Sequence, residues 1–183
     1  MGLCPLGQDR IAHHNQLRDV FYHTLVAAGV QADRETRFLL PGDDAGLKPA
    51  DCFARAWTGG RDTCFDIVTV HPCQQSHIEH SAVAPGYSLK AAHDRKLRHY
   101  QVRLQQQGVA FFPLAVCTFG SWHEVAQQQV KKAAAALSRH TGQLESTAVS
   151  HLWKRLSVTL QKANSAALAS RMEGSRPSQD GAL

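Results

Sequence analysis

The chain has 183 residues, 43% of them hydrophobic, which is enough to bury the core of one compact domain. Its five cysteines show no paired spacing typical of a zinc site, and their odd number favours reduced thiols in an intracellular compartment, the nucleus if the source is eukaryotic. No apolar run is long enough to cross a bilayer, so no membrane partner is expected.

The net charge of +5 is divided unevenly along the chain. Residues 1–85 contain seven Arg or Lys against ten Asp or Glu, a net charge of −3, whereas residues 86–171 contain twelve against three, a net charge of +9. A basic surface in the second half would attract a phosphate backbone without reading its sequence. The alternative is that these helices simply present solvated basic faces to water.

Hydrophobic periodicity and turn residues predict an α/β fold. The predicted elements are, in chain order, a helix over 11–29, a strand over 34–40, hairpin strands over 50–57 and 63–70, a helix over 87–107, a buried strand over 110–119, and helices over 122–139 and 147–170. Residues 11–171 are predicted to form the domain, after an N-terminal extension over 1–10 and before a disordered polar tail over 172–183.

Two aspartates lie on the predicted hairpin strands. Asp51 begins the first strand and Asp66 lies in the second, so pairing across the Gly59-Gly60 turn brings them to the same end of the hairpin. Asp66 lies in an apolar run that looks buried on both sides, where a carboxylate requires a partner or a metal. Two converging carboxylates form the hard oxygen site that Mg²⁺ prefers.

The next predicted helix carries a lysine and a tyrosine on its apolar face. The residues that recur at three- and four-residue steps are Leu89, His93, Lys96, Leu97, Tyr100 and Leu104. At about 100° per residue, Lys96 faces the sheet, whereas Lys90 lies toward the flank. An ammonium on the buried side needs a specific partner, and beside a metal site it can meet a phosphate.

Each of these residues also has an ordinary structural explanation. An aspartate at the start of a strand is commonly a turn or cap residue, and Lys96 and Tyr100 could extend from the helix edge toward water. A purely structural α/β interaction domain would, however, leave Asp66 and Lys96 without partners. The four residues together therefore indicate a site.

The order and spacing of these residues resemble the PD-(D/E)XK nuclease superfamily, and more closely the restriction-like endonuclease domain of non-LTR retrotransposons. In that domain the lysine has migrated from the second acidic strand to the following helix, where a tyrosine follows it. Pro49-Ala50-Asp51 corresponds to the first acidic motif, Asp66 to the second, and Lys96 to Tyr100 to the migrated lysine motif. The resemblance covers residues 13–171 and includes segments 14–19, 59–62 and 113–122.

Three features depart from the pattern of that family. Val68 occupies the position of the ordinary superfamily lysine, so the assignment to Lys96 depends on the migrated version. Cys117 stands where similar proteins commonly have an acidic residue. Before the first helix, Cys4, His13 and His14 are too few for the closed zinc module that related elements often carry there.

The resemblance implies a single-domain α/β fold with an αβββαβ core, two additional C-terminal helices and the activity of a Mg²⁺-dependent DNA endonuclease, for which Mn²⁺ substitutes. Asp51 and Asp66 would ligate the metal, with Glu35 as a weaker candidate for a further ligand. Lys96 would orient the attacking water or stabilise the transition state, and Tyr100 would position the lysine or contact phosphate.

DNA is the partner that the resemblance implies. A nick that leaves a 3′-hydroxyl would prime reverse transcription, so a reverse transcriptase encoded elsewhere is open as a second partner, and so is a homodimer that cuts both strands. The alternative function is a non-catalytic nucleic-acid-binding module, a decayed or domesticated remnant of the same fold.

Overall fold

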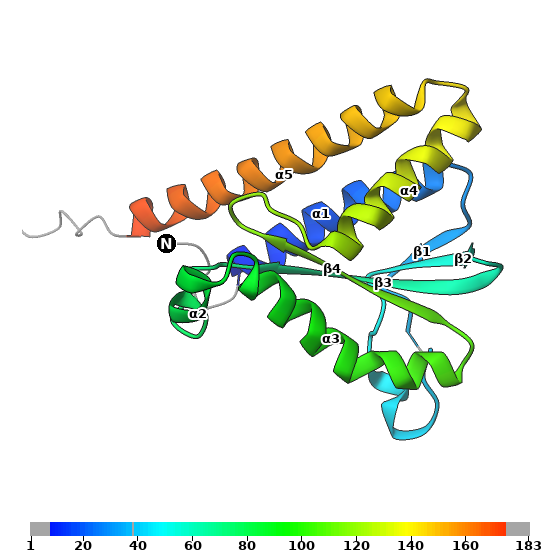
Figure 1. Cartoon of the computed structure of the whole chain (residues 1–183), viewed down its shortest axis with the longest axis horizontal. Coiled ribbons are helices and arrows are strands. Elements are labelled where there is room, and N and C mark those ends of the chain that lie inside the picture. Colours follow the sequence, from blue (N-terminus) through cyan, green and yellow to red (C-terminus); the bar gives the residue numbers. More distant parts are fainter. Residues whose placement is uncertain (1–7, 38, 175–183) are drawn as a thin grey trace, which may run out of the picture.

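The computed structural model describes residues 8–37 and 39–174, and this part of the chain forms a four-stranded sheet with helices on both faces (Figure 1). The elements are α1 (Gln8–Ala27), β1 (Ala32–Arg34), the 3₁₀ helix η1 (Gly42–Gly46), β2 (Cys52–Thr58), β3 (Arg61–Val70), α2 (Ile78–Val83), α3 (Tyr87–Gln106), β4 (Ala110–Cys117), α4 (Glu124–Thr141) and α5 (Glu145–Gly174).

The sheet is mixed, and its strands follow the order β1-β2-β3-β4. β1 and β2 are antiparallel, as are β2 and β3, whereas β4 runs parallel to β3. Cys52 at the start of β2 lies opposite Phe65 of β3, and the N–H of Asp51 donates to the Phe65 carbonyl at 2.9 Å. β3 continues to Val70, so β2 does not border residues 67–70, and this stretch is here called the open edge of β3.

Alternation along β3 separates two apolar cores. Phe65 and Ile67 belong to the core shared with α1, α4 and α5, whereas Cys64 and Val68 belong to the clusters that face α3. Because side chains alternate across a strand, Asp66 lies on the α3 face between Cys64 and Val68. The carboxylate is thereby placed inside an apolar layer.

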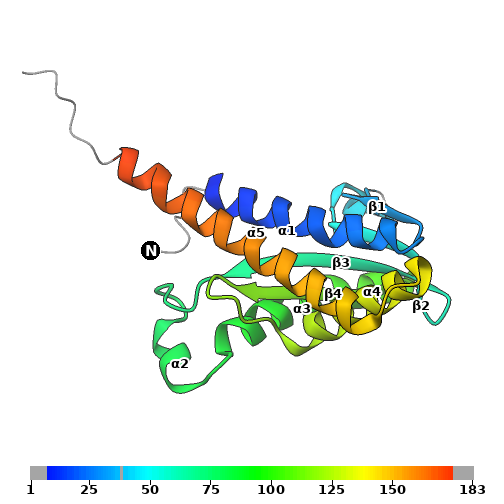
Figure 2. The same cartoon turned by 90° about the horizontal axis from the view of Figure 1, so that it is seen from above.

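The helices on the other face of the sheet are held by residues four positions apart. Leu17, Phe21 and Leu25 of α1 are all buried, and α5 buries its own stripe of Leu152, Leu156, Leu160, Ala163 and Ala167. The leucines of the α5 stripe join the α1 residues in the same core, and Figure 2 shows α5 running alongside α1. The helix predicted over 147–170 is confirmed, within the longer α5.

The predicted α/β class is confirmed, but the strand predicted over residues 34–40 is wrong. β1 is only three residues long, and Glu35 has a φ of 49°, which turns the chain out of the sheet. Its N–H still donates to the Asp51 carbonyl at 3.0 Å. The apolar residues that suggested a longer strand include Leu40, which packs with Phe53 in the core beneath α3.

Two short elements and both chain ends also differ from the predicted organisation. The periodicity did not predict α2 or η1, which lie between the expected elements. α1 begins at Gln8, inside the predicted extension, and α5 includes residues 172–174 of the predicted tail. The remainder of the predicted extension and tail, over 1–7 and 175–183, lies outside the described residues.

The sulfur chemistry agrees with the expectation of reduced thiols as far as the structure describes it. Cys52, Cys64, Cys73 and Cys117 are free, and Cys4 lies outside the described residues. Among the helices of the described segments, none combines the length and apolar character that crossing a membrane requires.

The packing of α5 on α1 leads to a stability prediction. Leu156 is 1% exposed, so Leu156→Ala should lower the free energy of unfolding by about 2–5 kcal/mol, through lost apolar contact and the cavity that remains. Val158, on the same helix, is 52% exposed. Val158→Ala should therefore change the free energy of unfolding by no more than about 0.5 kcal/mol. Urea denaturation of both variants checks this, and equal effects would show that α5 does not pack as described.

Candidate functional site

The two predicted aspartates lie side by side where the open edge of β3 begins. Asp66 is 4% exposed, and Asp51 precedes β2 directly. Oδ2 of Asp51 accepts a hydrogen bond from the N–H of Ile67 at 2.6 Å, which fixes this carboxylate against β3 next to Asp66. The hairpin pairing predicted from the sequence therefore brings the two carboxylates together.

Lys96 reaches the same point from α3. Its Nζ lies 2.7 Å from Oδ2 of Asp66, and 5.8 Å from the centroid of the Tyr100 ring. Lys90, on the same helix, instead keeps 72% of its side chain exposed and pairs with Asp94 at 2.7 Å. The predicted helix register, with Lys96 toward the sheet and Lys90 on the flank, is confirmed.

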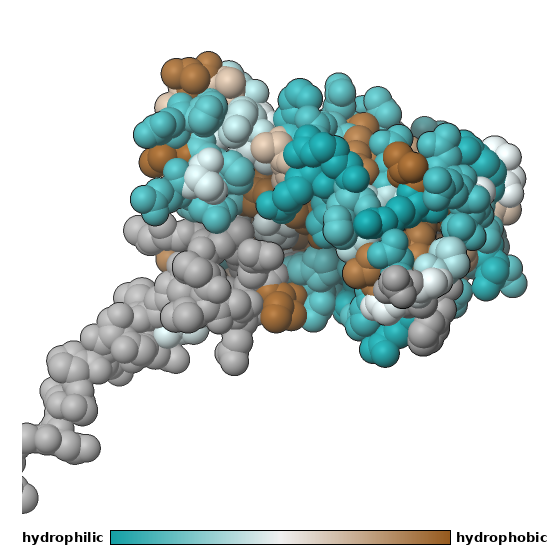
Figure 3. All heavy atoms as spheres, turned by 90° about the horizontal axis from the view of Figure 1, so that it is seen from below, coloured by the Kyte–Doolittle hydropathy of each residue, from teal (hydrophilic) through white to brown (hydrophobic). Residues whose placement is uncertain are grey.

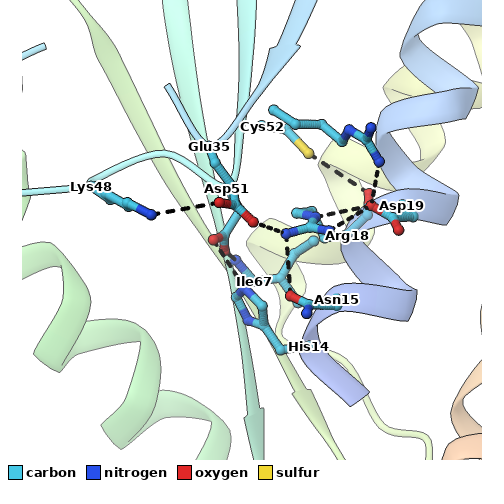
Figure 4. Close-up of polar contacts among 10 residues, drawn as sticks. His14, Asn15, Arg18, Asp19, Glu35, Lys48, Asp51, Cys52 and Ile67 are labelled. Carbon is cyan, nitrogen blue, oxygen red and sulfur yellow. Dashed lines mark hydrogen bonds and ion pairs between the residues drawn. The ribbon is translucent and has the colours of Figure 1, made fainter. Parts of the chain in front are cut away.

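His14 contacts the acidic pair from the opposite layer. Its Nε2 lies 3.0 Å from Oδ1 of Asp51 (Figure 4). With Lys96 at Asp66, α1 and α3 each contribute one basic side chain to the two carboxylates. The sequence drew attention to His14 only as an insufficient zinc ligand and as part of segment 14–19. The available signal was its four-residue spacing from Arg18, which places both side chains on one face of the helix.

Arg18 and Lys48 hold the carboxylate of Glu35. The Arg18 guanidinium pairs with Glu35 and also with Asp19 at 2.9 Å, and Lys48 Nζ lies 3.6 Å from Glu35 Oε2 (Figure 4). Across residues 8–37 and 39–174, no three His, Cys, Asp or Glu side chains are grouped closely enough to hold a metal ion. The structure thus brings Asp51, Asp66, Lys96 and Tyr100 together. Glu35 is bonded to Asp51 through its backbone, but its carboxylate pairs with Arg18 and Lys48.

The two aspartates differ in charge state because their surroundings differ. Burial raises the pKa of Asp66 to about 7, the negative charge of Asp51 adds to that effect, and Lys96 opposes it. Burial also acts to raise the pKa of Asp51, but the hydrogen bonds from His14 and the Ile67 N–H outweigh it and hold the pKa below its usual value. Asp51 is therefore ionised at neutral pH, whereas the protonation state of Asp66 changes near neutral pH.

The pKa of His14 is also shifted, through its contact with Asp51. Burial acts to lower it, but the hydrogen bond and the charge of Asp51 are stronger together, so the pKa lies above its ordinary value. A positive His14 then stabilises the ionised form of Asp51.

The two carboxylates offer oxygen ligands of the kind that a divalent cation takes. Oδ2 of Asp66 is buried and has the ion pair with Lys96 but no well-aligned hydrogen bond. Its carboxylate is also repelled by that of Asp51, and a cation held between the two would remove this repulsion. Asp51 and Asp66 are the residues that would hold it.

A pocket of about 360 Å³ lies along α3 beside this centre. The residues that line it are Arg95, Lys96, Arg98, His99 and Tyr100. Tyr100 packs against Phe111, with 5.7 Å between the ring centroids, and its burial raises the pKa of the phenol. The pocket therefore joins the acidic centre to a basic surface.

The fold and the site define an α/β protein with two carboxylates and a lysine at a sheet edge. No protein-family model matches the chain, and no curated protein matches its sequence. Function is therefore inferred from the geometry of the site and from the resemblance in its motifs.

The raised pKa of Asp66 predicts a pH-dependent stability. Between about pH 4, the ordinary value, and about pH 7, the folded state keeps a proton that the unfolded state has lost, so stability falls as the pH rises. Asp66→Asn removes this loss of stability. At pH 7.5 the Tm of the variant should exceed that of the wild type by about 3 °C, which corresponds to a gain of about 1 kcal/mol in the free energy of unfolding.

The measurement is thermal unfolding from pH 4 to 8 without divalent cations. Asp33→Asn, at an exposed aspartate of β1, is the control and should keep the pH dependence of the wild type. An Asp66→Asn variant with the same slope as the wild type would contradict the assignment of this proton to Asp66.

Proposed function

We propose that the chain is a metal-dependent DNA endonuclease domain of the PD-(D/E)XK type, in the migrated-lysine form of the non-LTR retrotransposon endonucleases. The observation that carries the proposal is the meeting of Asp51, Asp66 and Lys96, with Lys96 Nζ 2.7 Å from the buried Asp66 carboxylate. Further support comes from the chain order, in which an αβββαβ core, with the short helices η1 and α2 inserted, is followed by two helices. β4 also lies parallel to β3.

A bound divalent cation, Mg²⁺ or Mn²⁺ in its place, supplies positive charge at the phosphate and a water of lowered pKa. Asp51 and Asp66 would hold the cation, and His14 would keep Asp51 oriented. The Lys96 ammonium would donate to the attacking water or to a phosphate oxygen, where a preorganised donor is most effective in a partly dry site. Tyr100 would support the position of that ammonium.

A non-catalytic nucleic-acid-binding module of the same fold is the second candidate. It is favoured by the small donor set, because no third carboxylate joins Asp51 and Asp66 in the described part of the chain. Such a module would bind DNA but would not cut it in the presence of Mg²⁺. Nicking of a supercoiled plasmid in Mg²⁺, Mn²⁺ or EDTA separates the two candidates.

The carboxylates should be needed for cutting but not for binding. Asp51→Asn and Asp66→Asn should each abolish nicking, because one lost carboxylate weakens cation binding. DNA affinity should stay the same or rise slightly, because a charge that repels phosphate is removed. Plasmid nicking and fluorescence anisotropy on a short duplex measure the two effects, and metal-dependent cutting by either variant would refute the site.

The two lysines of α3 provide a matched comparison. Lys96→Ala should slow cleavage by about a hundredfold or more, comparable to the loss of one transition-state donor, while binding stays nearly intact. Lys90→Ala removes an equal charge from the same helix but one that is 72% exposed, so it should change the rate little. If Lys90→Ala abolished cleavage and Lys96→Ala left it unchanged, the assignment of the catalytic role to Lys96 would be wrong.

A further inference from the structure

Two arginines of α3 have no acidic partner among the residues that the structure describes. Arg95 and Arg98 are exposed, line the pocket beside Lys96, and form no ion pair with any residue that the structure describes. The other cations of this helix are paired, as Lys90 is with Asp94 and Arg103 with Asp44 at 3.0 Å. The uncompensated charge of α3 is thus concentrated next to the acidic centre.

The basic residues of the last helix lie on the other side of the molecule. Lys154 and Arg155 of α5 are exposed, but α5 packs on α1 and α4, across the sheet from α3 (Figures 1 and 2). Asp66 faces α3, so a phosphate that approaches Asp66 and Lys96 does so from the α3 side. Figure 3 views the molecule from this side and shows hydrophilic side chains gathered across its middle.

We propose that the pocket on α3 is a backbone-phosphate subsite, in which Arg95 and Arg98 hold a phosphate of the cleaved strand beside the scissile one. DNA then crosses the α3 face and not the α4–α5 face. This inference rests on the proposed function, because it takes DNA as the substrate of the adjacent centre.

The chemistry of the lining side chains favours this ligand. Residues three positions apart on a helix are neighbours, so the two guanidinium groups extend from the same part of α3. Each guanidinium presents a fork of donors that matches phosphate oxygens, and two neighbouring unpaired cations repel each other until an anion lies between them. A pocket of about 360 Å³ has room for such a group, and Lys96 in its lining connects it to the acidic pair.

The experiment compares two double variants that each remove two positive charges. Arg95→Ala/Arg98→Ala changes the α3 face, and Lys154→Ala/Arg155→Ala changes the α5 face. Binding of a labelled duplex is measured by fluorescence anisotropy between 50 and 200 mM salt in EDTA, and circular dichroism checks that each variant is folded. Arg95→Lys/Arg98→Lys tests whether charge alone is sufficient.

The α3 variant should bind at least tenfold more weakly at low salt. Its slope of log affinity against log salt should fall by about 1 to 2, because about 0.9 is lost for each phosphate contact. The α5 variant should keep the slope of the wild type, and the lysine variant should keep most of the affinity. Equal losses in the α3 and α5 variants, or no loss in the α3 variant, would overturn the inference.

Nicking separates this inference from the proposed function. If the wild type cuts and the α3 variant cuts with a raised KM and an unchanged kcat, both stand. If the wild type cuts and the α3 variant cuts with the wild-type KM, the subsite is wrong while the endonuclease stands. If the wild type never cuts but the α3 variant alone loses DNA affinity, the endonuclease is wrong while the binding face stands.

Discussion

The structure depends on one costly placement, a carboxylate in the middle of a buried strand. Asp66 lies on β3 between residues of the apolar layer beneath α3, and it is 4% exposed. A charge in that position requires opposite charge, which Lys96 provides only in part, since the pKa of Asp66 is still about 7. A fold that was selected for stability alone would place an apolar residue there.

Helices on both faces of the sheet contribute basic side chains to the acidic pair. α3 brings Lys96 to Asp66, and α1 brings His14 to Asp51, so each layer places a base beside one carboxylate. β2 begins only after Asp51, which leaves residues 67–70 of β3 without β2 as a neighbour and lets the Asp51 side chain accept from the Ile67 N–H. The acidic pair therefore belongs to the architecture of the sheet edge, and not to a flexible loop.

The fold distributes the basic residues of the second half of the chain over different faces of the molecule. The basic half includes α3, α4 and α5, but these helices lie on different faces of the sheet, so their charges do not form one surface (Figure 1). On α3 the paired cations stabilise the helix or the acidic centre, and the unpaired ones gather at the pocket beside it. Net charge alone is consistent with attraction to phosphate, and only the packing shows where the unpaired positive charge is concentrated.

The sequence by itself determined the features that follow from local periodicity. Alternation along a hairpin placed Asp51 beside Asp66, and the 3.6-residue repeat distinguished Lys96 from Lys90, because both depend on short-range geometry. Only the tertiary structure decided that His14 reaches Asp51 across 37 positions and that Glu35 turns toward Arg18 with a positive φ. Those contacts come from the packing of α1 against the sheet, a long-range event that no local pattern encodes.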